Sequence, residues 1–430
     1  MADAMPAPTE HPLRALLNDE VHARPHLRIG TPARITHLAH LTGEMVAADL
    51  EHITALCRQA GAPLPGADAR QVQLTLGDRL LKWERHTEFT AVTIAAPDPG
   101  DGHWSALTGA LTAWTDGLPG QRLVAVHLRI EADTAPPHGP ESLGRLFPSG
   151  DLVGSVINGG DALVWTDFRL GTDGFTRFLV RDRALTPSRA GRLARRLLEV
   201  ETYRMMALLG LPLAREAQPI LAGLERRLDE IVSRTAAARG VEEEHQLLDG
   251  LTRLAAELEA LNAHSRYRFG ATAAYAELVD QRLTELREDP IPSLQRIGIF
   301  LERRFRPAVR TCEAMARRQI QLAQGVARAS GLLRTRVDVH RAEQNVQIMR
   351  SLERRTATQI RIQEAVEGLS VFAISYYLLG LLKYVFEGLP GLGLHLPKEA
   401  FTALAVPLVL ASVWLGVRRV RRALKPDEEH

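Results

Sequence analysis

Two apolar runs near the C-terminal end constrain this chain more than any other feature of its sequence. The first, Gly368 to Phe386, is 19 residues long and has one charged side chain; the second, Phe401 to Val417, is 17 residues long and has none. They are separated by the Gly- and Pro-rich turn EGLPGLGLHLPKE. Each run is close to the roughly 20 residues that a helix needs to cross the hydrocarbon core of a bilayer. The alternative is a buried helical hairpin in a soluble core.

Basic residues are concentrated outside these two runs. The first run is preceded by ERRTATQIR and the second is followed by RRVRRALK, whereas the turn carries one lysine, Lys398. Because positive residues collect on the cytoplasmic side of a membrane, this distribution predicts that both chain ends lie in the cytoplasm. We therefore predict a two-helix transmembrane hairpin at 366–417 and a basic cytoplasmic tail at 418–430. Membrane lipids are the expected partners of the flanking basic residues, Arg354, Arg355, Arg361, Arg418 and Arg419. For the arginines before the first run, the alternative is the solvated face of a long helix.

The composition limits any membrane part to a minority of the chain. Of 430 residues, 45% are hydrophobic and 24% are charged, as in an ordinary globular protein. The formal net charge of +2 argues against a dedicated nucleic-acid binder. Cys57 and Cys312 are far apart and neither belongs to a CxxC motif, so neither a disulfide nor a cysteine-rich zinc site is expected. The N-terminal sequence lacks the basic and apolar regions of a secretory signal, so we expect a reduced, cytoplasmic soluble part.

Residues 1–186 have the pattern of a cytoplasmic α+β domain. Strands are predicted at ARITHLAHL and EFTAVTIAA, and a helix at GEMVAADLEHITALCRQAG, ending at Gly61. Short links such as Gly77-Asp78 predict antiparallel hairpins. The sequence leaves the order of the strands open.

Residues 187–365 are almost wholly helical in composition. A continuous helix from about 293 to 386 would be roughly 140 Å long at 1.5 Å per residue. Leu332, Val339 and Val346 are seven residues apart, which is typical of a coiled coil.

The first apolar run has a polar side when it is drawn as a helix. Tyr376, Gly380, Lys383 and Glu387 fall opposite a row of aliphatic residues. Because polar groups in a membrane span usually face protein or water, this side is a candidate lining for a pathway through an oligomer. In the alternative interpretation, Lys383 reaches the outer headgroups and Tyr384 and Glu387 lie at the interface.

The motif NDEVHARPH concentrates polar residues near the N-terminal end. Its candidate partner-site or anion-site residues are Asn18, Glu20, His22 and Arg24. His22 and His26 are four residues apart and would share a helical face suited to a metal, but Pro25 disfavours a continuous helix there. The motif is therefore expected to fix a turn, with an anion or partner site as the alternative. His37 and His40 belong to a predicted strand and point to opposite faces, which argues against a shared metal.

Motifs of common enzymes are absent from the sequence. It contains no GxSxG, HExxH or Walker pattern. We expect no enzymatic activity and no cofactor, and the sequence leaves a metal undetermined.

Two resemblances bear on these expectations. The sequences QNVQIMRSLERRTATQIRIQEAVEGLSVFAISYYLLGLLKYV and NDEVHARPHLRIGTPARITHLAHLTGE resemble the uncharacterised family of bacterial membrane-anchored proteins catalogued as domain of unknown function 3422. This resemblance implies a location in a bacterial inner membrane and no particular activity. The overall plan also resembles that of CorA-type magnesium transporters, which have a cytoplasmic α/β domain, a long helix entering the membrane, a short outer loop and a second span with a basic tail.

The Gly-Met-Asn signature of the CorA family is missing from this chain. Its place is taken by Tyr384, Val385, Phe386 and Glu387, and a ring of Lys383 side chains would repel cations. The resemblance therefore implies an inner-membrane, homo-oligomeric channel or transporter of CorA-like plan for an unidentified ion, and magnesium selectivity is not carried over from the family. The alternative is a membrane-anchored scaffold or regulatory protein whose cytoplasmic domain binds a partner.

Overall fold

A computed structural model describes residues 10–14, 17–18, 26–43, 45–238, 240–388 and 398–423 of this chain. Two compact units are present. The first comprises Met1–Ala237 and Leu247–Ser330, and the second comprises Ala238–Gln246 and Gly331–His430.

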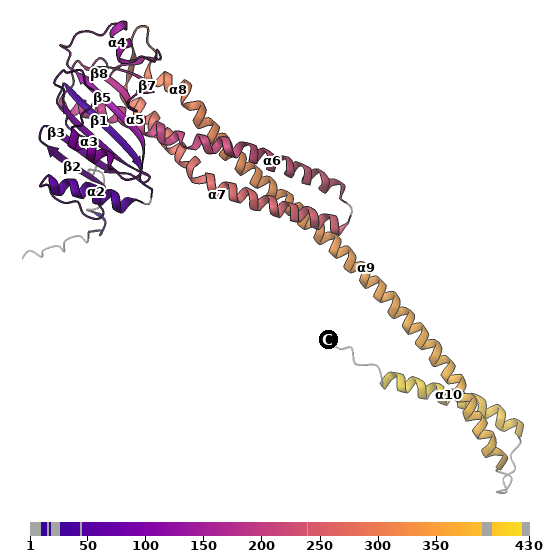
Figure 1. The fold of residues 1–430 in the computed structure, drawn as a ribbon. Helices are drawn as coiled ribbons and strands as arrows, with labels where there is room; N and C mark the ends of the chain where they lie inside the picture. Colours follow the sequence, from indigo (N-terminus) through magenta and orange to yellow (C-terminus); the bar gives the residue numbers. More distant parts are fainter. Residues whose placement is uncertain are drawn as a thin grey trace, which may run out of the picture. The chain divides into compact units, whose positions relative to one another are not determined.

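A nine-stranded sheet forms the centre of the first unit (Figure 1). In chain order its strands are β1 (Ala33–Leu41), β2 (Gln71–Leu76), β3 (Arg79–Arg85), β4 (Phe89–Pro97), β5 (Gln121–Glu131), β6 (Val153–Ile157), β7 (Ala162–Leu170), β8 (Thr176–Asp182) and β9 (Glu288–Pro290). Their spatial order is β2-β3-β4-β1-β5-β8-β7-β6-β9. β5 and β8 are parallel, and the other neighbours are antiparallel.

Helices complete the described part of the chain. They are α2 (Val46–Gln59), α3 (Gly109–Asp116), α4 (Pro140–Leu146), α5 (Pro187–Leu208), α6 (Gly210–Ala237), α7 (Val241–Leu286), α8 (Ile297–Arg304), α9 (Arg306–Gly388) and α10 (Lys398–Ala423). The expected α+β class is confirmed, with strands at both predicted sequences and a helix at 46–59.

Side-chain alternation along β1 places one hydrophobic core on each face of the sheet. Ile35 and Ala39 pack in the core that includes Leu193 and Leu197 of α5. Leu38 points the other way, into the core that includes residues of α2 and α3. Full burial of one side chain such as Ile35 contributes about 2 kcal/mol. Because β1 is central and covered on both sides, it is buried along almost its whole length, although Thr36, His37 and His40 are polar.

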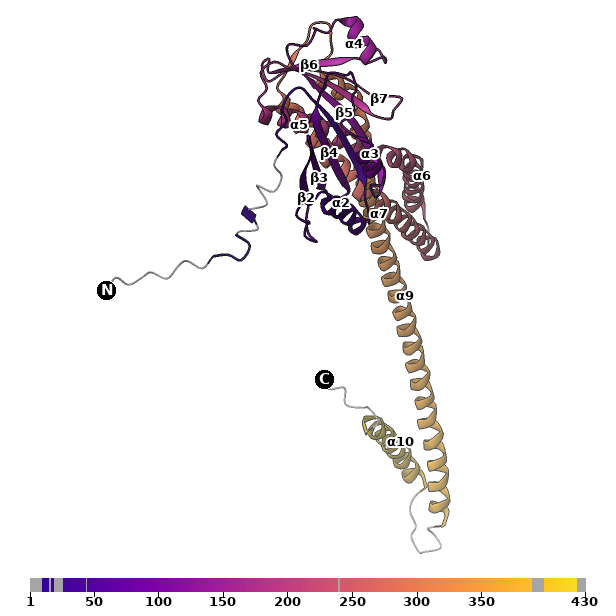
Figure 2. The same ribbon diagram turned by 60° about the vertical axis from the view of Figure 1, so that its left-hand side comes forward.

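In the first unit, α6, α7 and the N-terminal part of α9 lie side by side (Figures 1 and 2). Polar contacts join them in pairs. The Arg318 guanidinium on α9 donates to Glu225 on α6, with Nη2 2.6 Å from Oε2. The Gln319 amide on α9 donates to the Ser265 hydroxyl on α7 at 2.9 Å. These contacts fix the register of α9 against the other two helices.

The prediction of a two-helix transmembrane hairpin is wrong. In the part of the chain that the structure describes, only the helical segment Ile297–Val385 is long and apolar enough to cross a membrane, and its apolar part is almost wholly exposed. α10 does not meet this test. Its apolar run would extend only about 26 Å as a helix, short of the roughly 30 Å hydrocarbon core, and Pro407 lies inside it. The predicted turn at 389–397 lies outside the described residues.

Candidate functional site

A cavity lies between the sheet and α5. Its volume, taken as the space open to the centres of water-sized spheres, is about 50 Å³. Its titratable lining residues are His26, His37, Lys82, Glu84, His86, Arg195, Glu199 and Tyr203. A single water needs about 10–15 Å³ by this measure, so the cavity has room for a few waters or for one small polar group.

Three polar side chains form a row across the floor of this cavity. His37 on β1 is directly opposite Thr93 on β4, and Thr93 is directly opposite Lys82 on β3. Directly paired residues of neighbouring strands point to the same face of a sheet. The sheet thus presents an imidazole, a hydroxyl and an ammonium group to α5.

His37 is neutral and has both ring nitrogens hydrogen-bonded. The Thr202 hydroxyl donates to the Leu198 carbonyl at 2.8 Å, so it accepts from His37 Nε2–H, 3.1 Å away. His37 Nδ1 then accepts from the Thr93 hydroxyl at 2.8 Å. Burial lowers the pKa of His37 to about 4, in agreement with this neutral tautomer. His37 therefore ties the sheet to α5 and has no free nitrogen for a ligand.

Lys82 is the buried cation of the cavity. Its side chain is 4% exposed, and its Nζ lies 2.7 Å from Glu84 Oε1. Burial lowers the pKa of Lys82, because a low-dielectric surrounding disfavours the ammonium form, while the Glu84 carboxylate opposes this effect. An ammonium has three N–H donors. The contact with Glu84 is the one partner of Nζ among the described residues.

Local sequence signals place α5 over the row on the sheet. The Thr186 hydroxyl caps the helix by accepting from Arg189 N, and Pro187 occupies the first turn. Gly191 permits close approach of the segment before β1, because a Cβ atom there would overlap the Leu27 carbonyl oxygen. Ile29 N donates to the Pro187 carbonyl at 3.0 Å. The segment 26–29 is thereby held against α5 as one wall of the cavity.

Alternating charges continue from the cavity to α7. Arg195 Nε donates to Glu199 Oε1 at 2.7 Å, and the other Glu199 oxygen accepts from Arg282. Arg282 and Arg196 each donate to Glu285 at 2.9 Å. Glu199 is therefore already bound by two guanidinium groups. The Tyr203 side chain lies next to this network, and burial raises the pKa of its hydroxyl, so the phenol is protonated.

His26 closes the cavity on the side of the N-terminal motif. Its Nε2 lies 2.9 Å from the Ser188 hydroxyl oxygen, and that oxygen accepts a hydrogen bond from Arg192 at 2.7 Å. Burial, followed by the charges of Arg192 and Arg195, lowers the pKa of His26. His26 is thus a neutral group in a positively charged surrounding.

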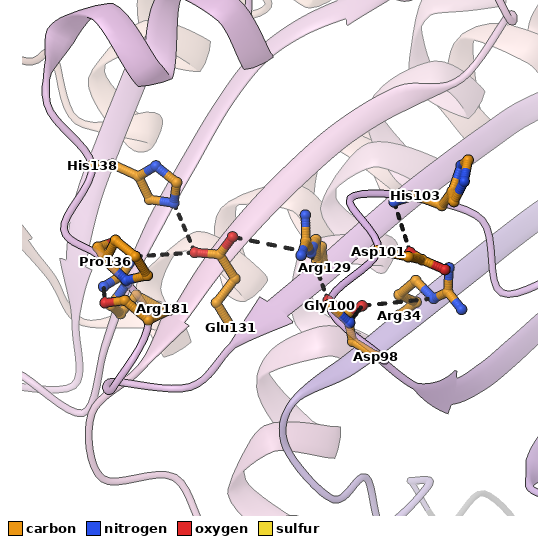
Figure 3. Close-up of polar contacts among 11 residues, drawn as sticks. Arg34, Asp98, Gly100, Asp101, His103, Arg129, Glu131, Pro136, His138 and Arg181 are labelled. Carbon is orange, nitrogen blue, oxygen red and sulfur yellow. Dashed lines mark hydrogen bonds and ion pairs between the residues drawn. The ribbon is translucent and has the colours of Figure 1, made fainter.

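A second polar cluster lies around the end of β5 (Figure 3). Glu131 accepts from His138 Nε2 at 2.7 Å and from Arg181 Nη2 at 3.1 Å. Arg181 also donates to the carbonyls of Ala135 and Pro136, both at 2.7 Å. These bonds hold the loop after β5 in place.

The same cluster continues along the edge shown in Figure 3. Asp98 accepts from Arg129 Nε at 2.6 Å, and Arg34 donates to Asp101 at 3.2 Å. Opposite charges are paired within the cluster, although Arg34 Nε and Arg181 Nε have no hydrogen-bond partner among the described residues, so its role is to join strands and loops. The cavity under α5 is the better candidate for ligand binding.

The predicted N-terminal site is only partly described. Asn18 is exposed. Glu20, His22 and Arg24 lie outside the described residues. His26, the last residue of the same motif, lines the cavity. Among the described residues no group of three or more His, Cys, Asp or Glu side chains is arranged to hold a metal ion.

The other predicted site residues belong to the second unit. Tyr376, Lys383 and Glu387 on α9 are exposed, and a Cβ atom at Gly380 would meet open space. The basic residues predicted to face lipid, Arg354, Arg355, Arg361, Arg418 and Arg419, are also exposed. Arg418 lies over the Trp414 ring, 4.8 Å from its centroid. Sequence reasoning missed Lys82, Arg195, Glu199 and Tyr203 as candidate site residues.

Comparisons with known proteins place the chain in a family. Searches of curated proteins and of solved structures find no match. The sequence model described as a protein of unknown function (DUF3422) matches residues 9–424. The chain belongs to the DUF3422 family.

Proposed function

We propose that this protein is a membrane-anchored regulatory or scaffold protein of the bacterial inner membrane. The C-terminal part of α9 is its anchor, and its α+β domain binds a partner at the cavity under α5. The exposed apolar end of α9 is the observation that carries this proposal. Its large exposed side chains include Leu369, Phe372, Leu381 and Val385. Removing each of them from water contributes roughly 1.5–3 kcal/mol, which a bilayer supplies.

A regulatory anchor is favoured over a transporter of CorA-like plan, because the CorA-like plan requires a second membrane span in each subunit. A transporter built from one span per subunit is the second candidate. It is supported by Tyr376, Lys383 and Glu387, which are polar, exposed and on one side of α9. In such an oligomer these side chains would face the symmetry axis.

Flotation with liposomes tests the anchor. The full chain should float with liposomes and resist extraction by alkaline carbonate. Phe372→Lys combined with Leu381→Lys places two charges in the apolar segment, each costing about 2.5–3.5 kcal/mol, and should release the protein. The control is Ile220→Lys, because Ile220 is an exposed apolar residue on α6 of the other unit. A charged double variant that floats like the unaltered chain would refute the anchor.

Ion flux into proteoliposomes separates the two candidates. As an anchor, the protein should conduct none of a panel of potassium, sodium, magnesium and chloride. As a transporter, it should conduct at least one of them, and Lys383→Glu should alter the ion preference by adding acidic rings beside Glu387. Unchanged flux and oligomer stability in both Lys383→Glu and Glu387→Gln would exclude the pathway along this side of α9.

A further inference from the structure

We propose that the cavity under α5 binds a small oxyanion, a carboxylate or phosphate group, with the Lys82 ammonium as its main contact. This inference rests on the proposed function, because it names the class of partner that the α+β domain binds. It concerns residues of the first unit only, so it can be tested separately from the membrane anchor.

The first support is the unused donor capacity of Lys82. Of three N–H donors, Glu84 takes one at 2.7 Å, and Nζ has no other partner among the described residues. The side chain is 4% exposed and lines the cavity. An ammonium in such a place is stabilised by further acceptors, and an oxyanion supplies two or three of them at once.

The second support is the balance of charge. The lining cations are Lys82 and Arg195, and the exposed Arg28 and Arg192 also act on His26 at the edge of the cavity. The lining carboxylates are Glu84 and Glu199, and Glu199 is already shared by Arg195 and Arg282. The two lining cations equal the two lining carboxylates in number, but Arg282 adds a third cation beside Glu199, so positive charge is in excess and an anion is favoured over a cation as the ligand.

The third support is the shape and lining of the cavity. A volume of about 50 Å³ accommodates one carboxylate or phosphate group and is too small for a nucleotide. The apolar lining residues Leu27, Phe89 and Leu198 limit access of water. Tyr203 also lines the cavity, and burial raises the pKa of its hydroxyl. As a protonated phenol it is a second donor for the ligand.

Thermal unfolding of the full chain in detergent measures this binding. Sodium phosphate, acetate and succinate are compared with sodium chloride at matched ionic strength. At about ten times the dissociation constant, a bound oxyanion should raise Tm by roughly 2–5 °C above the chloride value. If none of the three anions exceeds chloride, the proposal is overturned.

Paired substitutions locate the site. Lys82→Met with Glu84→Gln removes both charges and leaves neither partner unpaired, so the double variant should fold and lose the anion-dependent shift. Tyr203→Phe keeps the ring and should weaken binding by roughly fivefold to tenfold. Arg227→Gln is the matched control, because Arg227 is an exposed, paired cation on α6, and it should keep the full shift.

Two outcomes of this series count against the cavity. A double variant that folds, by its tryptophan fluorescence, and keeps the full shift would show that the anion binds elsewhere. Full binding by Tyr203→Phe together with loss of binding by Arg227→Gln would place the anion on the helical surface. Failure of the chain to float with liposomes leaves these results unaffected and refutes the anchor alone.

Discussion

Buried histidines make the stability of this protein depend on pH. Burial lowers the folded-state pKa of both His37 and His127 to about 4, from an ordinary value of 6.5. As the pH falls below 6.5, these histidines become protonated in the unfolded chain, whereas they stay neutral in the folded chain. The contribution of these histidines to the free energy of unfolding is therefore largest above pH 6.5. It decreases as the pH falls below 6.5 and reaches its lowest value near pH 4.

At pH 5 we expect a loss of about 2 kcal/mol for each of these histidines relative to pH 7. Urea unfolding followed by tryptophan fluorescence at the two pH values measures it. His37→Gln retains a donor and an acceptor but cannot titrate, so its decline should be smaller. His264→Gln, an exposed position on α7, should decline like the unaltered protein. Equal unfolding midpoints at pH 7 and pH 5 would contradict the assignment.

Two glycines in helices should respond oppositely to the same substitution. Gly191→Ala places a Cβ atom onto the Leu27 carbonyl oxygen and should cost about 3 kcal/mol or more by forcing α5 away from segment 26–29. Gly223→Ala on α6 meets open space and should gain about 0.5–1 kcal/mol from helix propensity. Thermal unfolding of the two variants gives the comparison. A stabilising Gly191→Ala would show that the close approach is absent in solution.

The residues of the cavity left only a weak signal in the sequence. Lys82 and Glu84 are two apart in the strand RLLKWER, so alternation places a charged pair on one face. A charged pair on one face of a half-apolar strand is the pattern by which Lys82 and Glu84 could have been found as candidate site residues. Arg195 and Glu199 look like an ordinary surface pair on a helix, and their position over β3 exists only once α5 lies on the sheet.

At the scale of elements, local periodicity predicted β1, β4 and α2, because each carries its own alternation or helical spacing. It misjudged α10, where an apolar run of 17 residues was treated as equal to one of 19. It also missed β9, because three residues carry too little pattern to be seen.

The exposed stretch of α9 should pair with a second copy. Every residue from 341 to 366 is exposed, and in proteins most of the stability of a helix comes from packing of an apolar face rather than from its intrinsic propensity. Val346 belongs to the seven-residue repeat, whereas Ile348 is about 200° away around the helix. Val346→Asp should therefore weaken self-association more than tenfold, and Ile348→Asp should change it little. Sedimentation of the full chain in detergent measures both, and equal effects would rule out this register.

At the scale of the whole molecule, composition and patterning predicted the α+β class and the helical region that follows. Composition and patterning could not predict the order of the strands. Pairing such as that of β5 with β8 joins segments about 50 residues apart and depends on tertiary packing. The cavity depends on the same long-range arrangement. Its walls come from four elements and from the segment before β1.

β9 is synthesised long after its partner strand β6, and this delay affects how the domain folds during synthesis. β9 pairs with β6, and the core beneath α5 also contains Leu286, Ile297 and Val309. At 5–20 residues per second, about 130 residues separate β8 from Val309, so part of this core stays uncovered for roughly 6–25 seconds of synthesis. During that interval the nascent domain presents an open sheet edge and apolar surface, which are the features that chaperones bind. A fragment of the chain that ends at residue 186 would keep this sheet edge and apolar surface exposed.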